Sequence, residues 1–335
     1  MRFAIATAVL FLAGSPLAAQ PPAKTDEVKM DETTKKATAR ALAWLAARQN
    51  PDGSWTDGRY AHNTAITSFC LLAFLSQGHL PNQGQYGGEV AKGMRFLLAS
   101  QREEDGYLVG ARGGNMYCHG MATLALAELW GSTGEDTVKP VLKRAVELIV
   151  KCQNTEGGWR YEPRQSGADI SVTIMQVMAL RAAKNAGFNV PDKTLRDALK
   201  YVENCYKPDS GGFSYQAYGG PPGFARTAAG CCVLFLAGDY NAKQLPKAVE
   251  YLKDHFDANQ HFSYGHYYAA HAMHQVGGKE WADWYARIKG HYLNTQDSDG
   301  SYSTLERGSA GPVMQTSIAV IVLSVPAHYL SIFQR

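Results

Sequence analysis

Several features that would assign a chemistry directly are missing from this sequence of 335 residues. It has no Gly-x-x-x-x-Gly-Lys-Ser/Thr phosphate loop, no Gly-x-Ser-x-Gly nucleophile turn, no His-Glu-x-x-His metal motif and no Cys-x-x-Cys pair. Charged residues make up only 19% of the chain, the formal net charge is +3, and no block of Lys or Arg occurs. The absence of a basic block argues against nucleic acid as a partner.

A long apolar run is also absent from the N-terminus. The run 3–13 is too short to span a bilayer comfortably, so no stable membrane span is expected. Arg2 precedes this run and the small residues 17–19 follow it, which is the pattern of a secretory signal peptide over residues 1–19. We therefore expect an exported protein, either periplasmic or secreted.

The chain as a whole has the composition of a folded protein, with 45% hydrophobic residues. Residues 20–33 are polar and show no core pattern, which predicts a flexible linker. Residues 34–335 are expected to form a single domain.

A short signature recurs through this domain: a Gln, a few turn residues, a Gly and then an aromatic residue. Its six copies, of which the fourth lacks the Gln and the fifth is degraded, are Gln49–Trp55, Gln101–Tyr107, Gln153–Trp159, Gly211–Phe213, Gln260–Phe262 and Gln296–Tyr302. Successive aromatic residues are separated by 40 to 54 positions. The spacing predicts six structural repeats, in which the signature joins neighbouring repeats rather than contacting a substrate.

Each repeat combines two kinds of helix. An amphipathic helix is predicted before the signature, as at 34–48 and 138–152, because apolar residues recur at three- and four-residue spacing. Nearly apolar helices are predicted after it, at 64–76, 121–129, 172–183, 227–237, 267–276 and 315–324. Glycines are expected to end five of these: Gly78, Gly131, Gly187, Gly238 and Gly277.

The alternation of helix types predicts an all-α protein with two layers. The apolar helices need burial on all sides, and the amphipathic helices would shield them from water. Six such hairpins can close into an α/α toroid, with an inner barrel of helices inside an outer barrel. An open solenoid is the competing architecture, but the chain shows no polar capping repeat at either end, which favours the closed ring.

The repeated signature resembles the QW motif of squalene and oxidosqualene cyclases. The helical phrases 121–130, 169–180 and 267–278 are similar to inner helices of the squalene cyclase and protein prenyltransferase β-subunit superfamily. The resemblance covers about residues 35–330 and is nearest to exported single-toroid proteins with prenyltransferase/squalene oxidase repeats. It implies the toroid fold, whereas function depends on individual sites.

The resemblance implies two chemistries, and the motif of neither is complete. The acid motif of the cyclases, Asp-x-Asp-Asp-Thr, corresponds to Asp169–Thr173, where Ser171 and Val172 replace the two central carboxylates. Asp169 is therefore interpreted first as a helix N-cap and second as a catalytic group. The Asp-x-Cys motif that binds zinc in the prenyltransferases is absent. Whether the chain is an enzyme thus stays undecided at this point.

In a closed ring the N-termini of the inner helices would converge on one mouth. The candidate catalytic residues there are Asp169, His119 and His266. These residue types suggest one cofactor, zinc, whose site would use His62, Cys118, His119 and Asp169. The expected cavity-lining residues are Asn63, Tyr117, Arg226, Tyr267, Tyr268 and His271.

An apolar cavity with a mouth of Tyr, His and Asn suits an isoprenoid or other lipid-like ligand. The first functional hypothesis is accordingly an exported toroid that binds such a molecule. Three alternatives stay open: an enzyme that uses the His/Cys/Asp cluster, a glycan-acting toroid, and a scaffold for a protein of the cell envelope.

Overall fold

The computed structural model describes residues 28–305 and 311–334. The predicted signal peptide 1–19 and most of the linker lie outside the described residues. The first helix, α1, begins at Glu32, where the Asp31 side chain accepts a hydrogen bond from the backbone N–H of Thr34. No helix among the described residues is both long and apolar enough to cross a membrane.

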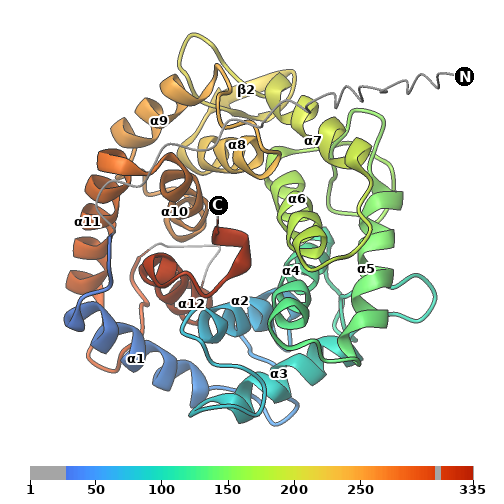
Figure 1. Ribbon diagram of the computed structural model, residues 1–335, viewed down its shortest axis with the longest axis vertical. Coiled ribbons are helices and arrows are strands. Elements are labelled where there is room, and N and C mark those ends of the chain that lie inside the picture. The colour runs from blue at the N-terminus through green and yellow to red at the C-terminus, as the bar shows by residue number, and fades with distance from the viewer. Residues whose placement is uncertain (1–27, 306–310, 335) are drawn as a thin grey trace, which may run out of the picture.

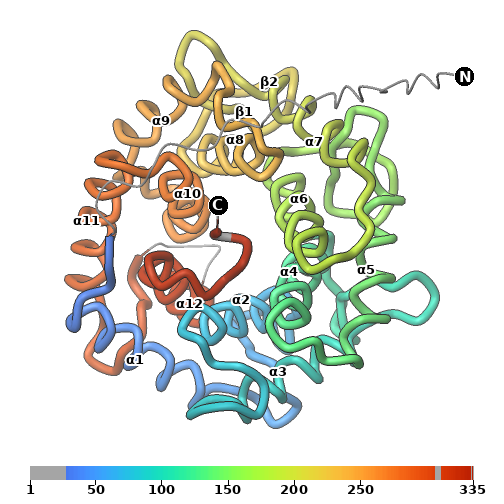
Figure 2. The backbone as a smooth tube through the Cα atoms, in the orientation of Figure 1, coloured from blue at the N-terminus to red at the C-terminus, as the bar shows by residue number. Residues whose placement is uncertain are grey.

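The described residues form a closed ring of two concentric layers of helices, as the sequence predicts (Figures 1 and 2). The outer layer consists of α1 (Glu32–Ala46), α3 (Gly87–Ala99), α5 (Val138–Cys152), α7 (Asp192–Asn204), α9 (Leu245–Asp254) and α11 (Gly278–Thr295). The inner layer consists of α2 (Thr64–Leu75), α4 (Met116–Thr133), α6 (Ile170–Asn185), α8 (Phe224–Leu236), α10 (Phe262–Val276) and α12 (Pro312–Ser324). The predicted all-α toroid is therefore confirmed.

The burial of the two layers follows from their sequences. In α2 every residue except Ala65 is buried, because this helix packs on its inner-layer neighbours α4 and α12 and on the outer helices. In α7 only one face is buried, formed by Thr194, Leu195, Ala198, Tyr201 and Val202. The amphipathic outer helices thus provide the solvent-exposed surface that the apolar inner helices cannot.

The signature glutamines join successive repeats. Nε2 of Gln153 donates to the carbonyl oxygens of Gly157, in its own turn, and of Thr194, in the next outer helix, both at 2.8 Å. Gln49 and Gln101 make the equivalent pairs of bonds. Gln296 closes the ring, because its Nε2 donates to the carbonyl of Ala37 in α1 at 2.9 Å. The prediction that the signature joins neighbouring repeats agrees with these bonds.

The glycine of each signature turn allows this close approach. Gly157 has φ of +97°, and a Cβ at this position would lie 2.1 Å from the carbonyl oxygen of Asp197 in α7. The following aromatic residue fills the space between the layers: Trp159 is 1% exposed, and its Nε1 donates to the carbonyl of Ile149 at 2.8 Å. The repeat is therefore maintained by packing and backbone hydrogen bonds.

Three predicted helix boundaries are corrected. Helix α4 begins at Met116, five residues before its predicted start. Gly131 lies inside α4, which continues to Thr133 and ends at Gly134 in the left-handed conformation. Helix α10 begins at Phe262, five residues before its predicted start, because its first turn contains apolar and aromatic residues that pack in the core. This earlier start places His266 inside the helix and away from the mouth.

The two ends of the inner barrel differ. At one end, the loops that precede the inner helices include a hairpin of β1 (Ser214–Gln216) and β2 (Gly219–Pro222). At the other end the C-terminal segment, with the short helices η1 (Val325–Ala327) and η2 (Ser331–Phe333), turns back toward the centre of the ring (Figure 1). The buried carboxylate of Glu128 in α4 accepts hydrogen bonds from the backbone of Ser331 and Ile332 at 2.8 and 3.0 Å and from the Ser331 hydroxyl.

Candidate functional site: the mouth of the inner barrel

The N-termini of all six inner helices contribute to a mouth that consists of two adjoining lobes. The inner lobe has a volume of about 290 Å³ and is lined by Tyr60, Asn63, Ala65, Ile66, Phe69, Asn115, Tyr117, Cys118, Met121, Met175, His261, Tyr264 and Met314. The outer lobe has a volume of about 710 Å³ and is lined by Tyr117, Tyr161, Ser171, Tyr215, Gln216, Gly219, Gly220, Pro221, Ala225, Arg226, His261 and Tyr264. The two lobes share Tyr117, His261 and Tyr264.

The chemistry of the lobes differs. Ile66, Phe69 and three methionines make the inner lobe mainly apolar. In the outer lobe phenol hydroxyls, the Gln216 amide and the Arg226 guanidinium meet the backbone of a glycine-rich hairpin. Nη1 of Arg226 donates to the carbonyl of Pro221 at 2.8 Å, which holds the guanidinium beside this lobe.

Tyrosines connect the lobes. The Tyr117 ring lies 6.0 Å from that of Tyr161 and 6.2 Å from that of Tyr264, measured between centroids. The hydroxyls of Tyr161 and Tyr215 are 2.5 Å apart, and the Tyr268 hydroxyl donates to that of Tyr264 at 2.7 Å. Burial raises the pKa of Tyr117, Tyr215 and Tyr264, so these phenols are neutral at physiological pH.

Asp169 lies in the wall behind these tyrosines and is fully buried. Its Oδ1 accepts a hydrogen bond from the backbone N–H of Val172 at 2.9 Å, so Asp169 is the N-cap of α6. Burial raises the pKa of its carboxyl, although this hydrogen bond, the Tyr215 hydroxyl and Arg160 act to lower it. Its Oδ2 has no hydrogen-bond partner within the described part of the chain. Asp169 is thus a cap whose second carboxyl oxygen is not used in capping the helix.

His119 occupies a structural position. Its Nδ1 accepts from the backbone N–H of Leu108, and its Nε2 donates to the carbonyl of Ala145, both at 3.1 Å. The hydroxyls of Thr173 and Thr227 accept equivalent backbone bonds in the next two repeats. Burial lowers the pKa of His119 to about 4. Both ring nitrogens of His119 are thus bonded inside the wall, which places the residue behind the mouth; its catalytic role stays a prediction.

The predicted zinc ligands are not brought together. His62 lies on an exposed turn, where its Nδ1 is 2.6 Å from a carboxylate oxygen of Asp52. Cys118 lines the inner lobe beside Asn63, while His119 and Asp169 are buried in the wall. Over residues 28–305 and 311–334 no three His, Cys, Asp or Glu side chains are placed to hold a metal ion. The predicted site made of these four ligands is therefore corrected, because the residues present do not fit zinc.

His266 also lies away from the mouth. It is fully buried among the rings of Phe224, Phe256 and Phe262, whose centroids are 4.3 to 4.7 Å away, and its Nε2 bonds the carbonyl of Phe256 at 3.1 Å. Burial lowers its pKa to about 3. The predicted position of His266 at the mouth is corrected, because it lines neither lobe; its catalytic role stays a prediction.

The structure places the predicted lining residues at three depths. Asn63, Tyr117 and Arg226 line the mouth as expected. Tyr267 and Tyr268 are instead buried beneath it, where the Tyr268 hydroxyl supports Tyr264. His271 belongs to the opposite end of the barrel.

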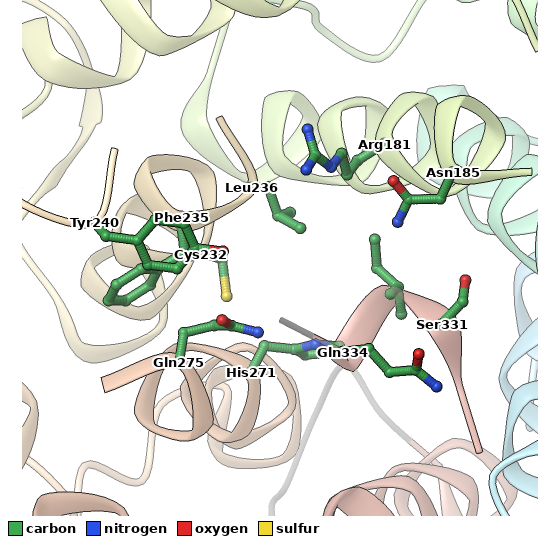
Figure 3. A pocket seen from close by; sticks show the side chains of 11 residues that line it. Arg181, Asn185, Cys232, Phe235, Leu236, Tyr240, His271, Gln275, Ser331 and Gln334 are labelled. Carbon is green, nitrogen blue, oxygen red and sulfur yellow. The ribbon is translucent and has the colours of Figure 1, made fainter. Parts of the chain in front are cut away.

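A separate pocket of about 440 Å³ lies at the C-terminal ends of α6, α8 and α10 (Figure 3). His271 and Gln275 of α10 line it opposite Arg181 and Asn185 of α6, and Ser331 and Gln334 of the C-terminal segment form a further wall. The predicted position of His271 at the mouth is corrected, because it lies more than two turns along α10 from the helix N-terminus.

Sequence reasoning missed Tyr161, Tyr215, Tyr264 and His261. Tyr161 lies in a loop and Tyr215 in the strand β1, and the course of both segments depends on the tertiary structure. His261 and Tyr264 come to the mouth only because α10 starts earlier than predicted. Tyr161 lies two positions after Trp159, the last residue of the third signature. This spacing is the one sequence signal that could have identified it.

Comparison with known proteins agrees with the geometry of the ring. The chain belongs to the prenyltransferase alpha-alpha toroid domain family, whose matches cover residues 5–144 and 116–278. A comparison with curated proteins gives no match.

Solved structures with the same fold include proteins of different activity. A variant of the type II terpene cyclase MstE from Scytonema, in complex with its substrate geranylgeranyl dihydroxybenzoate, is 13% identical, with 89% of this chain and 98% of that chain covered and a TM-score of 0.65. The α-1,6-mannanase GH76A of Salegentibacter sp. HEL1_6, an inactive variant in complex with α-1,6-mannotriose, is 9% identical, with coverages of 88% and 99% and a TM-score of 0.68. A protein from Actinoplanes is 17% identical, with coverages of 88% and 99% and a TM-score of 0.60. At these identities the likeness is one of fold.

Proposed function

We propose that this protein binds an isoprenoid or other lipid-like molecule in the mouth of the inner barrel. The observation that carries the proposal is the change of chemistry between the adjoining lobes. The apolar part of the ligand would lie in the inner lobe against Phe69, Met121 and Met175, where its burial is favourable at about 25 cal/mol per Å². A polar end would remain in the outer lobe, within reach of Arg226 and the tyrosine hydroxyls.

The fold and the N-terminus support the same function. MstE, which shares the toroid, carries a geranylgeranyl group in its substrate complex, and a comparable apolar chain is the ligand proposed for this protein. The predicted signal peptide adds a location, since we propose that the protein acts after export, in the periplasm or outside the cell. Such a compartment would bring it close to membrane lipids and envelope proteins.

Binding of geranylgeraniol, followed by isothermal titration calorimetry and native mass spectrometry, tests the proposal. Ala65 lines the inner lobe and is only half-buried, so Ala65→Phe should fill the lobe and weaken binding at least about tenfold. Ala46→Phe, at a half-buried position on the outer helix α1, is the matched control and should bind as the wild type does. Equal affinities of the two variants would exclude the inner lobe as the binding site.

The same titration separates the other functions. Binding of α-1,6-mannotriose but not of geranylgeraniol would favour a glycan-acting toroid, in which the open outer lobe and its tyrosines hold the sugar. If the protein is an enzyme, the carboxyl of Asp169 is the acid group nearest the tyrosines. Asp169→Asn should then abolish turnover of the bound ligand while leaving its affinity within about threefold.

A further inference from the structure

We infer that the mouth face docks on a membrane surface with anionic headgroups, so that the lipid-like ligand enters the inner lobe directly from the bilayer. This inference rests on the proposed function. The docking surface is the mouth rim, defined as the segments 57–63, 109–115, 160–169, 215–226 and 257–262, which lie at the N-terminal ends of five of the inner helices.

Arginine dominates the charge of this rim. It contains Arg59, Arg112, Arg160, Arg164 and Arg226, and none of them belongs to an ion pair within the described structure. Outer helices differ, since many of their lysines pair with carboxylates, as Lys143 does with Glu147 and Lys193 with Asp197. Unpaired arginines gathered on one face suit a surface that carries negative charge.

The carboxylates of the rim do not neutralise it. Asp57 is buried and accepts backbone N–H bonds at the start of α12, and Asp169 is buried as the cap of α6. Asp257 pairs with Arg287 of the outer helix α11. Of the carboxylates in these segments, Glu162 is therefore the one that is exposed and has no ion pair in the described structure. The N-termini of the inner helices add partial positive charge to the same end.

Exposed tyrosines accompany the arginines. Tyr60, Tyr161 and Tyr218 are 38%, 36% and 84% exposed, and Tyr218 lies at the tip of the β1–β2 hairpin. Arg59 and Arg160 lie beside the rings of Tyr60 and Tyr161, at 5.0 and 5.5 Å from the ring centroids. Tyrosine is enriched at membrane–water interfaces because its ring is apolar and its hydroxyl is polar. Arginine and tyrosine together therefore favour a lipid surface over a soluble polyanion.

The position of the inner lobe supports the same partner. Tyr60 lines this lobe and is also exposed on the rim, so the apolar cavity opens on the face that carries the arginines. A lipid-like molecule that passes from a docked bilayer into this lobe avoids exposure to water, which is the main energetic cost of its transfer. Docking and ligand uptake would thus use one face of the ring.

The test is co-sedimentation of the purified protein with phosphatidylcholine vesicles that contain or lack phosphatidylglycerol, at low and high salt. The wild type should bind the anionic vesicles at low salt, release them at high salt and bind the neutral vesicles weakly. The triple variant Arg59→Gln, Arg112→Gln, Arg164→Gln removes rim charges that line neither lobe. Each arginine contributes roughly fivefold near an anionic surface, so the triple variant should bind about a hundredfold more weakly.

A second triple variant is the control. Lys36→Gln, Arg196→Gln and Lys200→Gln remove the same charge from exposed positions on the outer helices α1 and α7 and should leave vesicle binding within about threefold. Equal loss in both triple variants would show a general charge effect and would overturn the inference. The inference would also be overturned if the wild type bound neutral and anionic vesicles equally, or if the rim variant bound anionic vesicles as tightly as the wild type does.

Two further measurements separate docking from the ligand site. Geranylgeraniol binding by the rim variant should equal that of the wild type, so failure of the proposed function appears in that titration and failure of docking appears with the vesicles. Tyr218→Ser should weaken vesicle binding without changing its salt dependence, because it removes an aromatic contact and no charge. Tight binding to soluble dextran sulfate together with no binding to anionic vesicles would show that the partner of the rim is a soluble polyanion and not a membrane.

Discussion

The two ends of the inner barrel consist of the same six helices and nevertheless have different surroundings. At the mouth, loops rich in Tyr and Arg surround two lobes that adjoin each other. At the far end the C-terminal segment approaches the centre of the ring and is bonded to the buried carboxylate of Glu128 (Figure 2). The difference shows that the repeat produces the ring, while the loops and the tail decide which end can receive a ligand.

The largest effect on stability is expected from a substitution in the wall of the ring, which both ends share. Trp159→Ala removes a buried indole and its hydrogen bond to Ile149, and should lower the free energy of unfolding by about 3–5 kcal/mol. Urea denaturation measures the change, with Tyr161→Phe as a surface control expected to differ little. An unchanged midpoint for Trp159→Ala would contradict the structural role of the signature.

A smaller effect should be confined to the far end. Glu128→Ala removes the acceptor of three hydrogen bonds from Ser331 and Ile332 and should destabilise the protein by about 2 kcal/mol. Carboxypeptidase digestion should then remove the tail faster than in the wild type, while geranylgeraniol binding at the mouth is retained. Ser331→Ala removes only the hydroxyl bond and should have a weaker effect. A tail equally protected in all three proteins would argue against this anchor.

The third prediction concerns pH and the wall near the mouth. Because burial lowers the pKa of His119 from 6.5 to about 4, the unfolded chain binds a proton there that the folded protein does not. Stability should be retained above pH 6.5 and fall by up to about 1.4 kcal/mol per pH unit between pH 6.5 and 4. His119→Thr, which introduces the residue found at the equivalent positions 173 and 227, should reduce this slope by about one proton. Denaturation at a series of pH values measures the slope of the free energy of unfolding against pH. An identical slope in the wild type and in His119→Thr would count against a neutral buried histidine.

The smallest effect is expected from a single hydroxyl at the mouth. Tyr215→Phe removes the bond to Tyr161 and should change stability by about 0.5 kcal/mol or less. Because the Tyr215 hydroxyl lowers the pKa of Asp169, its removal should raise that pKa further, which a carboxyl NMR titration can detect. Tyr218→Phe, on the same hairpin and exposed, should leave the pKa of Asp169 unchanged. A shift in the control alone would contradict the proximity of Tyr215 and Asp169.

Predictions about the fold succeeded because its determinants are local and repeated. Residues of the kinds of Gln153, Gly157 and Trp159 recur around the ring. The Gln and the Gly contact the next outer helix α7, and the Trp donates to the carbonyl of Ile149 in the preceding outer helix α5. Predictions about the site succeeded in part. Asn63, Tyr117 and Arg226 were placed at the mouth because each is the cap of an inner helix or stands within its first three residues.

The failures have a different physical cause. His119 and Asp169 both stand near the starts of inner helices in the sequence. Whether a side chain there points into a cavity or into the wall depends on the rotation of its helix against two neighbours. His266 and His271 were misplaced because α10 begins five residues earlier than its pattern suggested, so that one is buried among aromatic rings and the other reaches the far pocket.

Periodicity and turn chemistry are properties of short segments, so the two helical layers, the number of repeats and the tendency to close could be predicted from the residues alone. The array of Tyr117, Tyr161, Tyr215 and Tyr264, and the contact between Glu128 and Ser331, depend on how the helices pack in three dimensions. These residues lie far apart along the chain, and closure of the ring is what brings them into contact.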